Sequence, residues 1–371
     1  MDTQKISKKI QNRFQRLLEA NPKIHNACLL VESQPHGLHL GLASGQSQTQ
    51  AGEILPAHPQ QSVFMASVGK LCTAVLIGLL VEAGKLRFED ALAQYLDEEL
   101  LKNLHVYKGV DYTRQIRLSH LLNHTSGLHD YFEDKPQRGE PMLNIILNQP
   151  QRRWTPREVV IWSKENLKAH FPPGQKLHYS DTGYHLLGLV VEAVSGLSFA
   201  EALHQYLFQP LGMKHAFLLG HSRPQEENPF GIAGLYFGDK NVIEYASLSM
   251  DYAGGGVTAP LQEWLIFLRA LAHGHILQPA TLQRMREDAA RFSIGIDYGY
   301  GVMNITTVPL IMPRRFNCWG NAGSTGAFLF YHPVLDACLI GSLNQFGYAP
   351  KAIRFMLQMV DILWKEIKPL S

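Results

Sequence analysis

The chain has 371 residues, of which 46% are hydrophobic and 18% are charged, and its formal net charge is +2. This composition is typical of a globular protein and argues against a disordered chain. So small a net charge gives no electrostatic reason to expect nucleic acid as a partner.

The predicted elements begin with a helix over about residues 3–20. This segment is charged and amphipathic and lacks the apolar core of a secretory signal, so we expect a cytoplasmic protein. The segments "NACLLVES" and "LHLGLASG" then alternate like the two strands of a hairpin. The next stretch, "LPAHPQQSVFM", is expected to be a loop that leads to a buried helix.

Helical patterns dominate from about residue 86 to residue 271, strand signals return after about residue 293, and a helix over about residues 350–367 ends the chain. The longest apolar run, near residues 71–81, is shorter than the roughly 20 residues that a membrane span needs. The four cysteines have no CxxC spacing, which predicts buried free thiols in a reducing compartment.

This order of elements predicts an α+β fold with an antiparallel sheet that is flanked by the terminal helices. Residues 1–66 and 290–371 would form one domain from both ends of the chain, and residues 67–289 a mainly helical inserted domain. A cleft between two such domains is a common place for a small-molecule site.

Ser67 and Lys70 stand at the start of the buried helix, in "FMASVGKLCTAVLIGLLVEAG". Residues at i and i+3 share one helix face, so the two side chains should meet. A helix N-terminus favours negative charge and burial disfavours an ammonium, so Lys70 can serve as a general base for Ser67. A capping serine followed by a surface lysine would give the same spacing, but the helix is apolar nearly all round, which favours a buried lysine.

Two further segments carry candidate site residues. Tyr179 precedes a helix in "PPGQKLHYSDTGY", where its phenol can relay a proton if a nearby cation lowers its pKa. Asp181 in the same segment would be a good N-cap for that helix. The small-residue bend in "CWGNAGSTGAF" lets a ligand approach the backbone closely, although glycine suits a plain hairpin turn equally well.

Taken together and in order, these segments resemble the serine β-lactamase superfamily. The resemblance is strongest to the branch that holds class C β-lactamases, D-alanyl-D-alanine carboxypeptidases, D-aminopeptidases and related carboxylesterases, and it covers about residues 63–345. It is carried by "SVFMASVGKL", "LLNHTSGL", "PPGQKLHYSDTGYHLLG", "YLFQPLGM", "YAGGGVTAP" and "GNAGSTGAF". The resemblance implies a β-lactamase/transpeptidase-like fold and acyl transfer through a covalent serine ester, with no metal or cofactor.

The resemblance also implies residue roles. Ser67 corresponds to the acylated nucleophile, Lys70 to its base partner, and Tyr179 to the first residue of a Tyr-x-Asn element. Asn321, Ala322 and Gly323 occupy the place of a Lys-Thr-Gly or His-x-Gly element. The backbone N–H groups of Ser67 and Ser324 would form the oxyanion hole.

The chain departs from the family pattern at two of these positions. Asp181 stands where the family usually has Asn. Its carboxylate either favours the ammonium form of Lys70, leaving proton transfer more to Tyr179, or turns away and caps the helix. Asn321 stands where Lys or His is usual, so it offers no cation to the carboxylate of a penicillin or a D-Ala-D-Ala peptide. We therefore expect a neutral ester or amide in preference to a β-lactam.

Three histidines and a run of glycines match metal-binding and phosphate-binding patterns only in part. His120 and His124 lie at i and i+4 with His129 close behind, but no third ligand has useful spacing, so no metal site is expected. The run from Gly254 to Gly256 lacks the Lys-Ser/Thr of a phosphate-binding loop and is read as a turn.

The sequence thus predicts a serine hydrolase that acts through an acyl-enzyme on a small ester, amide or D-amino-acid peptide. Its partner would be a small-molecule substrate, with specificity set by loops such as "DYFEDKPQRGEPMLN" and "GHSRPQEENPFGIAG". A catalytically disabled binding protein on the same fold, or a true β-lactamase or penicillin-binding DD-peptidase, would also be compatible with the sequence.

Overall fold

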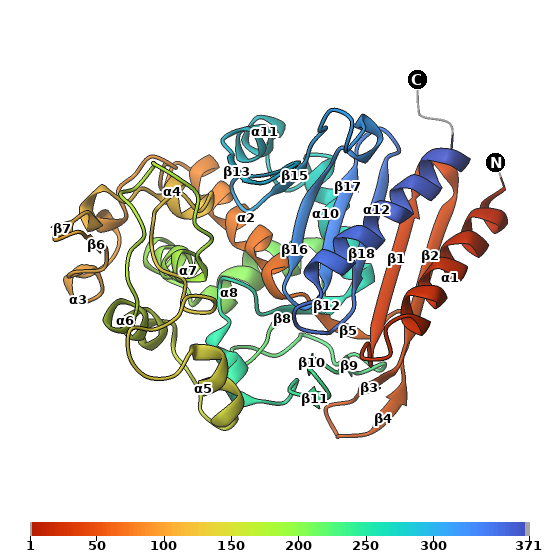
Figure 1. Cartoon of the computed structure of the whole chain (residues 1–371), viewed down its shortest axis with the longest axis horizontal. Helices are drawn as coiled ribbons and strands as arrows, with labels where there is room; N and C mark the ends of the chain where they lie inside the picture. The colour runs from red at the N-terminus through yellow and green to blue at the C-terminus, as the bar shows by residue number, and fades with distance from the viewer. Residues whose placement is uncertain (1, 368–371) are drawn as a thin grey trace.

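The computed structural model describes residues 2–367, and its main element is an eight-stranded antiparallel sheet (Figure 1). The strand order is β13-β14-β15-β16-β17-β18-β1-β2, so the first two strands of the chain lie beside the last six. The strands are β1 (Ala27–Ser33), β2 (Leu38–Ser44), β13 (Ala290–Ser293), β14 (Ile296–Tyr298), β15 (Met303–Ile305), β16 (Cys318–Gly323), β17 (Ala327–His332) and β18 (Ala337–Ser342). The predicted α+β fold, with one sheet built from both chain ends, is confirmed.

Both faces of this sheet are covered by helices. Successive residues of β1 alternate between two apolar cores, with Cys28 and Leu30 in one and Leu29 and Val31 in the other. Helices α1 (Thr3–Glu19) and α12 (Ala349–Glu366) pack on the second face, and α10 (Leu261–Ala272) packs on the first. Because the sheet is buried on both sides, its central strands read as continuous apolar runs.

The middle of the chain is mainly helical. Its helices are α2 (Gly69–Glu82), α3 (Glu98–Leu101), α4 (Leu118–Leu122), α5 (Met142–Asn148), α6 (Pro156–Asn166), α7 (Asp181–Ser195), α8 (Phe199–Leu203), α9 (Gln209–Leu211) and α11 (Pro279–Glu287). A short π-helical turn, His204–Phe208, joins α8 to α9. The domain boundaries at residues 66 and 290 remain a prediction, and α10 packs on the sheet although it lies inside the segment predicted as the insert.

A second, six-stranded sheet was not foreseen. Its strands are β4 (Ile54–Pro56), β3 (Gln46–Gln48), β9 (Ile232–Ala233), β5 (Ser62–Phe64), β12 (Val257–Pro260) and β8 (Phe217–Leu218). The prediction that "LPAHPQQSVFM" is a loop was wrong, because β5 and the last two residues of β4 lie within it. Both strands have three residues, and β5 pairs with residues almost 200 positions away, so no local periodicity reveals them. Two small hairpins complete the strands: β6 (Val106–Tyr107) with β7 (Val110–Asp111), and β10 (Tyr236–Phe237) with β11 (Lys240–Asn241).

Helix α2 lies between the main sheet and the helical region, in contact with β16 on one side and with α7 on the other. Its first turn follows directly after β5, through a short 3₁₀ turn, η2 (Ala66–Val68). The start of α2 therefore follows β5 in the chain and lies near β16 and α7, which come from distant parts of the sequence.

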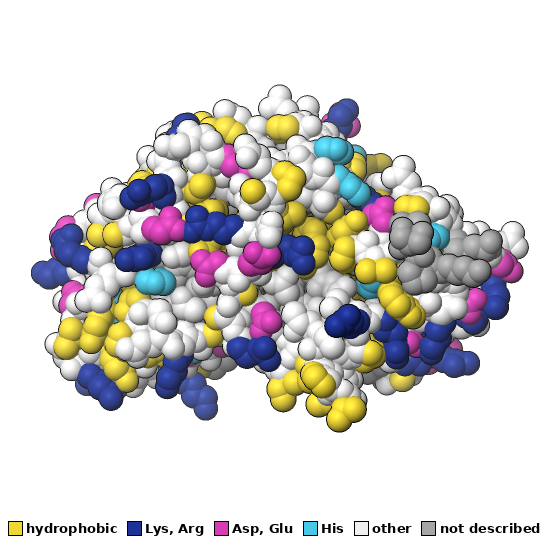
Figure 2. Space-filling model, turned by 90° about the horizontal axis from the view of Figure 1, so that it is seen from above, with side chains coloured by type: hydrophobic (Ala, Val, Ile, Leu, Met, Phe, Trp, Pro, Cys, Tyr) yellow, Lys and Arg dark blue, Asp and Glu magenta, His cyan; other side chains and the backbone are white. Residues whose placement is uncertain are grey.

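Three simpler expectations can be compared with the structure. All four cysteines are buried and unpaired, as predicted. Within residues 2–367 no single helix is long and apolar enough to cross a membrane, although the bent pair Asp181–Ser195 and Phe199–Leu211 qualifies by length and composition. On the face drawn in Figure 2, basic and acidic side chains lie interspersed, in keeping with the small net charge.

Candidate active site

Ser67 lies in the 3₁₀ turn η2, where the chain passes from β5 into α2. The residue before it, Ala66, has a φ of 47°. This left-handed conformation costs a non-glycine residue roughly 1–2 kcal/mol, and such strain is often found at functional sites. The turn places Ser67 on the wall of a cavity that Asp181 and Ser324 also line.

Lys70 is fully buried, and its ammonium group has three acceptors within reach. Its Nζ lies 3.2 Å from Ser67 Oγ and also donates to a carboxylate oxygen of Asp181 and to the carbonyl oxygen of Gly254. An ammonium has three N–H donors, so all of them are used here. The full set of partners explains how a buried cation is tolerated at this position.

Asp181 turns its carboxylate toward Lys70 and does not cap its helix. The N-cap of α7 is Ser180, whose hydroxyl accepts a hydrogen bond from Gly183 N at 3.1 Å. Asp181 is the first residue of the helix and forms the ion pair with Lys70. Of the two orientations left open by the sequence, the capping one was therefore wrong, because serine already holds that position.

The glycine run from Gly254 to Gly256 brings a carbonyl group into this site. A Cβ atom on Gly254 would lie 2.9 Å from Asp181 Oδ1, and one on Gly69 in α2 would collide with the carbonyl oxygen of Gly255. The turn expected from the sequence is present, since Gly256 has a φ of 65°. Glycine is required here because the backbone approaches the helix and the ion pair too closely for a side chain.

Two more carboxyl groups lie near the ion pair, those of Asp251, which is partly buried, and Asp130, which is buried. Asp251 lines the cavity, and burial raises its pKa to about 7, with the negative charge of Asp181 adding to the rise and Lys70 opposing it. Asp130 accepts a hydrogen bond from Asp181 N at 3.0 Å. Burial and then the Asp181 charge raise the pKa of Asp130 well above its usual range. Asp181 is thus the one carboxyl group in contact with Lys70, and its charge acts on both Asp130 and Asp251.

Tyr179 is also close to Lys70, whose Nζ is 4.9 Å from the centre of the phenol ring. Burial, followed by the charge of Asp181, raises the pKa of Tyr179, while a contact with the Ser67 hydroxyl acts in the opposite direction. The sequence analysis expected Tyr179 to relay a proton with a pKa lowered by a nearby cation, and no such lowering is found. Tyr179 stays a neutral phenol beside the Ser67 hydroxyl.

The end of strand β16 meets the Ser67 turn. A Cβ atom on Gly323 would lie 2.9 Å from the Cβ of Ala66 and 3.2 Å from Ser67 N. Ser324 follows directly and is part of the cavity wall. The two amides expected to form the oxyanion hole thus come from segments that touch each other.

Asn321 is on the same strand but its side chain is directed elsewhere. The side chain is fully buried, and its Nδ2 donates to Tyr298 Oη at 3.1 Å and to the Gly301 carbonyl oxygen at 2.8 Å. Its Oδ1 accepts a hydrogen bond from Ala322 N at 2.7 Å. The structure therefore brings Ser67, Lys70, Tyr179, Asp181, Gly323 and Ser324 together, but it does not bring the Asn321 side chain into the cavity.

The cavity encloses about 510 Å³ of empty space, part of it open to solvent, and most of its wall is apolar. The segment "DYFEDKPQRGEPMLN", residues 130–144, was predicted from the sequence to set specificity. It contributes Tyr131 and Phe132 to the cavity wall. The sequence analysis did not name the remaining apolar wall residues, which lie far apart in the chain. They are Phe64, Ala66, Ile146, Leu235, Phe237, Leu248, Met250 and Phe346.

His120, His124 and His129 do not belong to the group of described residues whose ligand atoms lie close together. His124 is packed between the rings of Tyr179 and Tyr298, and its Nδ1 accepts a hydrogen bond from Ser180 N at 3.1 Å. His124 is therefore part of the support of the segment that carries Tyr179.

A family model described as Beta-lactamase matches residues 31–359 of the chain. The chain belongs to the Beta-lactamase family. The sequence is 24% identical to the putative penicillin-binding protein PbpX of Bacillus subtilis (strain 168), over 92% of this chain and 80% of that protein. It is 30% identical to penicillin-binding protein 4 of Amycolatopsis lactamdurans, over 53% of this chain but only 45% of the relative.

Several solved structures share the fold. A D-stereospecific amidohydrolase from Streptomyces sp. has a TM-score of 0.74 at 20% identity, covering 92% of this chain and 97% of the other. The D-amino acid amidase from Ochrobactrum anthropi SV3 has a TM-score of 0.74 at 21% identity, covering 96% and 100%. EstCE1, described as a hydrolase with promiscuous acyltransferase activity, has a TM-score of 0.74 at 21% identity, covering 98% and 99%. The predicted β-lactamase/transpeptidase-like fold is confirmed.

Proposed function

We propose that the protein is a serine hydrolase. A small ester or amide transfers its acyl group to Ser67, and water then hydrolyses this acyl-enzyme and frees Ser67. The observation that carries this proposal is the 3.2 Å contact between Lys70 Nζ and Ser67 Oγ at the wall of the cavity. A serine is activated by an adjacent group that can take its proton, and Lys70 is the group in contact with Ser67.

The proton of Ser67 needs an acceptor before the bond to the substrate forms. The ammonium of Lys70 has no free lone pair, so it first passes one proton to the Asp181 carboxylate with which it is paired. The resulting amine then takes the proton from Ser67 Oγ, and the total charge of the group does not change. When the leaving group departs, the proton that Lys70 took from Ser67 is relayed to it through the Tyr179 phenol, which gives up one proton as it receives another and so stays neutral.

The negative charge that develops on the substrate oxygen requires donors. The amide of Ser67 lies in the first turn of a helix, where N–H groups have no intrahelical acceptor. The Ser324 amide follows the strand end that touches this turn. Together they form the proposed oxyanion hole, in which each donor typically contributes ~10²–10³ in rate.

The lining of the cavity favours an uncharged, apolar acyl group. The rings of Phe132 and Phe346 are 5.5 Å apart, and those of Phe237 and Phe346 are stacked at 4.5 Å. The described wall holds no lysine, arginine or histidine, whereas Asp181 and Asp251 are both part of it. A substrate carboxylate would find no cation in the described wall to pair with, so neutral esters and amides with an aromatic or branched acyl group suit the site better than penicillins.

Hydrolysis of p-nitrophenyl butyrate by the wild type and by Ser67→Ala tests the proposal, together with labelling by a fluorophosphonate probe. We expect turnover and labelling in the wild type and neither in Ser67→Ala. Activity that survives in Ser67→Ala would show that the nucleophile is a different residue. A wild type that is neither active nor labelled would favour the catalytically disabled binding protein. D-phenylalanine amide in the same assay extends the comparison from esters to amides.

A further inference from the structure

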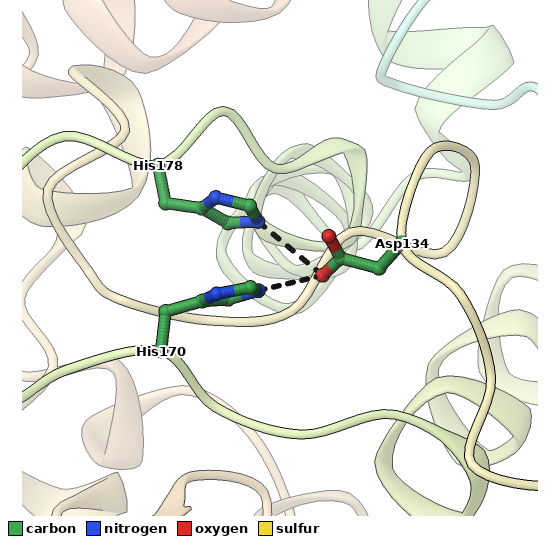
Figure 3. A group of neighbouring side chains, drawn as sticks. All are labelled: Asp134, His170 and His178. Atoms are coloured by element: carbon green, nitrogen blue, oxygen red, sulfur yellow. Dashed lines mark hydrogen bonds and ion pairs between the residues drawn. The ribbon is translucent and has the colours of Figure 1, made fainter.

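A second group of polar side chains lies on loops, one of which leads directly into Tyr179, and the proposed hydrolase mechanism does not use it. It consists of Asp134, His170 and His178, drawn in Figure 3. Both imidazole rings direct Nε2 at the same carboxylate oxygen of Asp134, at 2.8 Å from His170 and 3.3 Å from His178. We propose that these three side chains form a binding site for a divalent transition metal of the Zn²⁺ type.

The spacing of the three ligand atoms fits such an ion. All of them lie within 4.8 Å of one another. A tetrahedral Zn²⁺ with ligands at about 2.0–2.1 Å places neighbouring ligand atoms roughly 3.3–3.4 Å apart. The two Nε2 atoms lie 2.8 and 3.3 Å from the Asp134 oxygen, so both of these separations are within roughly 0.6 Å of the spacing that the ion needs. Two imidazoles and one carboxylate favour Zn²⁺, Cu²⁺ or Ni²⁺ over Mg²⁺ or Ca²⁺, which prefer oxygen ligands.

The backbone holds the ligands in place before any ion arrives. His170 N donates to the Gly127 carbonyl at 2.9 Å, and His178 N donates to the His124 carbonyl at 2.9 Å. The two rings stack with centres 3.5 Å apart. The Asp134 oxygen that faces both rings also accepts a hydrogen bond from Asp130 N at 2.8 Å. This last contact orients the carboxylate as metal-binding carboxylates are usually oriented.

The remaining coordination positions are open to water. The side chains of Asp134, His170 and His178 are 18%, 36% and 26% exposed. An ion can therefore enter from solvent and keep water as its other ligands, as in zinc sites with three protein ligands. The same loops carry Asp130 and Tyr179, so a bound ion would tie together two segments that approach the Ser67 site.

The test uses the full chain after removal of metal with EDTA, followed by equilibrium dialysis against ZnCl₂ and measurement of bound zinc. We expect one Zn²⁺ per wild-type chain and a melting temperature that rises with zinc concentration. The double variant His170→Asn/His178→Asn should lose at least tenfold in affinity, since even residues that merely support a ligand are typically worth ~10–100-fold. His39→Asn/His275→Asn, which removes two exposed histidines elsewhere, is the matched control and should bind like the wild type.

Equal zinc binding by the wild type and the His170→Asn/His178→Asn variant would overturn the proposal, as would a wild type that binds no zinc. If the double variant fails to fold, the single variant His170→Asn replaces it, because that side chain is the most exposed of the three. Visible absorption of Co²⁺ bound to the wild type, absent from His170→Asn, then gives the supporting result, and identical spectra give the opposing one. These measurements concern metal binding alone, so their outcome does not depend on whether Ser67 is active.

Discussion

A buried ammonium is stable in a protein only where acceptors replace its hydration, and Lys70 has such acceptors in Ser67, Asp181 and Gly254. Asp181 is the charged member of this set, and its side chain is only 11% exposed. The same contact that lets the chain bury Lys70 also decides where the proton of the pair resides. Stability and proton transfer are therefore coupled at this one ion pair.

Lys70→Met should destabilise the protein as well as abolish hydrolysis. The methionine leaves the Asp181 carboxylate buried without its cation, and breaking a buried ion pair costs roughly 3–5 kcal/mol. Lys70→Met/Asp181→Asn should recover much of this loss, because no charge then remains unpaired. Urea unfolding at pH 7 measures both variants. A double variant no more stable than Lys70→Met would show that the pair is not the source of the effect.

Because the pKa of Asp251 is raised in the folded chain, we predict that the free energy of unfolding depends on pH through this residue. Its pKa in the folded chain is raised from 3.8 to about 7, so between these values the folded chain binds more protons than the unfolded chain. The contribution of Asp251 to the free energy of unfolding is therefore present at low pH and is lost as the pH rises through this range. In the wild type, Gly256 N donates a hydrogen bond to the Asp251 carboxylate at 3.1 Å. Asp251→Asn keeps an acceptor for this N–H in its amide oxygen.

Relative to the wild type, Asp251→Asn should consequently gain stability between pH 4 and pH 7, by roughly a few kcal/mol. Urea unfolding at several pH values in this range measures the difference. Asp239→Asn, at a carboxyl that is 81% exposed, is the control and should follow the wild type. Parallel curves for wild type and Asp251→Asn would contradict the prediction.

At the scale of elements, the site depends on how closely strand β16 approaches the η2 turn. In Gly323→Ala the new methyl group would meet Ala66 Cβ at 2.9 Å and Ser67 N at 3.2 Å, so the strand and the turn must separate. Because the proposed oxyanion donors lie on these two segments, kcat/KM for an ester should fall by ~10²-fold or more.

Gly183→Ala is the matched control for Gly323→Ala. Gly183 lies in the first turn of α7, where the nearest atoms to a new methyl group are at ordinary contact distance, 3.5 Å or more. Alanine is also the better helix former, so this variant should be at least as stable as the wild type. Equal losses of kcat/KM in the two variants would show that the approach of β16 to the turn has no special role.

The elements themselves were largely predictable from the sequence. The terminal helices and the first hairpin agree with their predicted positions, and strands β16, β17 and β18 fall in the region after about residue 293 where strands were predicted, because each has a local apolar pattern. The spacing of Ser67 and Lys70 on a buried helix was also visible, and the structure brings these side chains together. These features depend on residues that are close in sequence.

The features that were missed depend on residues far apart in sequence. Strand β16 is buried on both faces, so its pattern does not reveal that the Asn321 side chain is directed toward Tyr298. His170 and His178 are 36 and 44 residues from Asp134, on loops without periodicity. Only the tertiary arrangement of these loops places the three side chains together.

At the scale of the whole molecule, the chain separates the residues that stabilise the sheet from those that line the cavity. Helices α1 and α12 pack against each other on one face of the main sheet (Figure 1). Phe14 of α1 is 5% exposed, and its ring lies 6.2 Å from that of Phe355. The cavity is lined by a different set of aromatic residues, among them Phe346. Two aromatic positions can therefore be used to test whether stability and activity are separable.

Phe14→Ala should lower the free energy of unfolding by roughly 3–5 kcal/mol, since it leaves a hole in a closed apolar core. Its kcat/KM for p-nitrophenyl butyrate, per folded molecule, should stay unchanged because no residue of α1 lines the cavity. Phe346→Ala should show the reverse, with a smaller loss of stability because its side chain is only half-buried. In that variant kcat/KM should fall by about tenfold or more, since the acyl group loses an aromatic contact. If Phe14→Ala lowers kcat/KM as strongly as Phe346→Ala while remaining folded, the sheet and its helices influence the cavity directly, and the separation inferred from the packing does not hold.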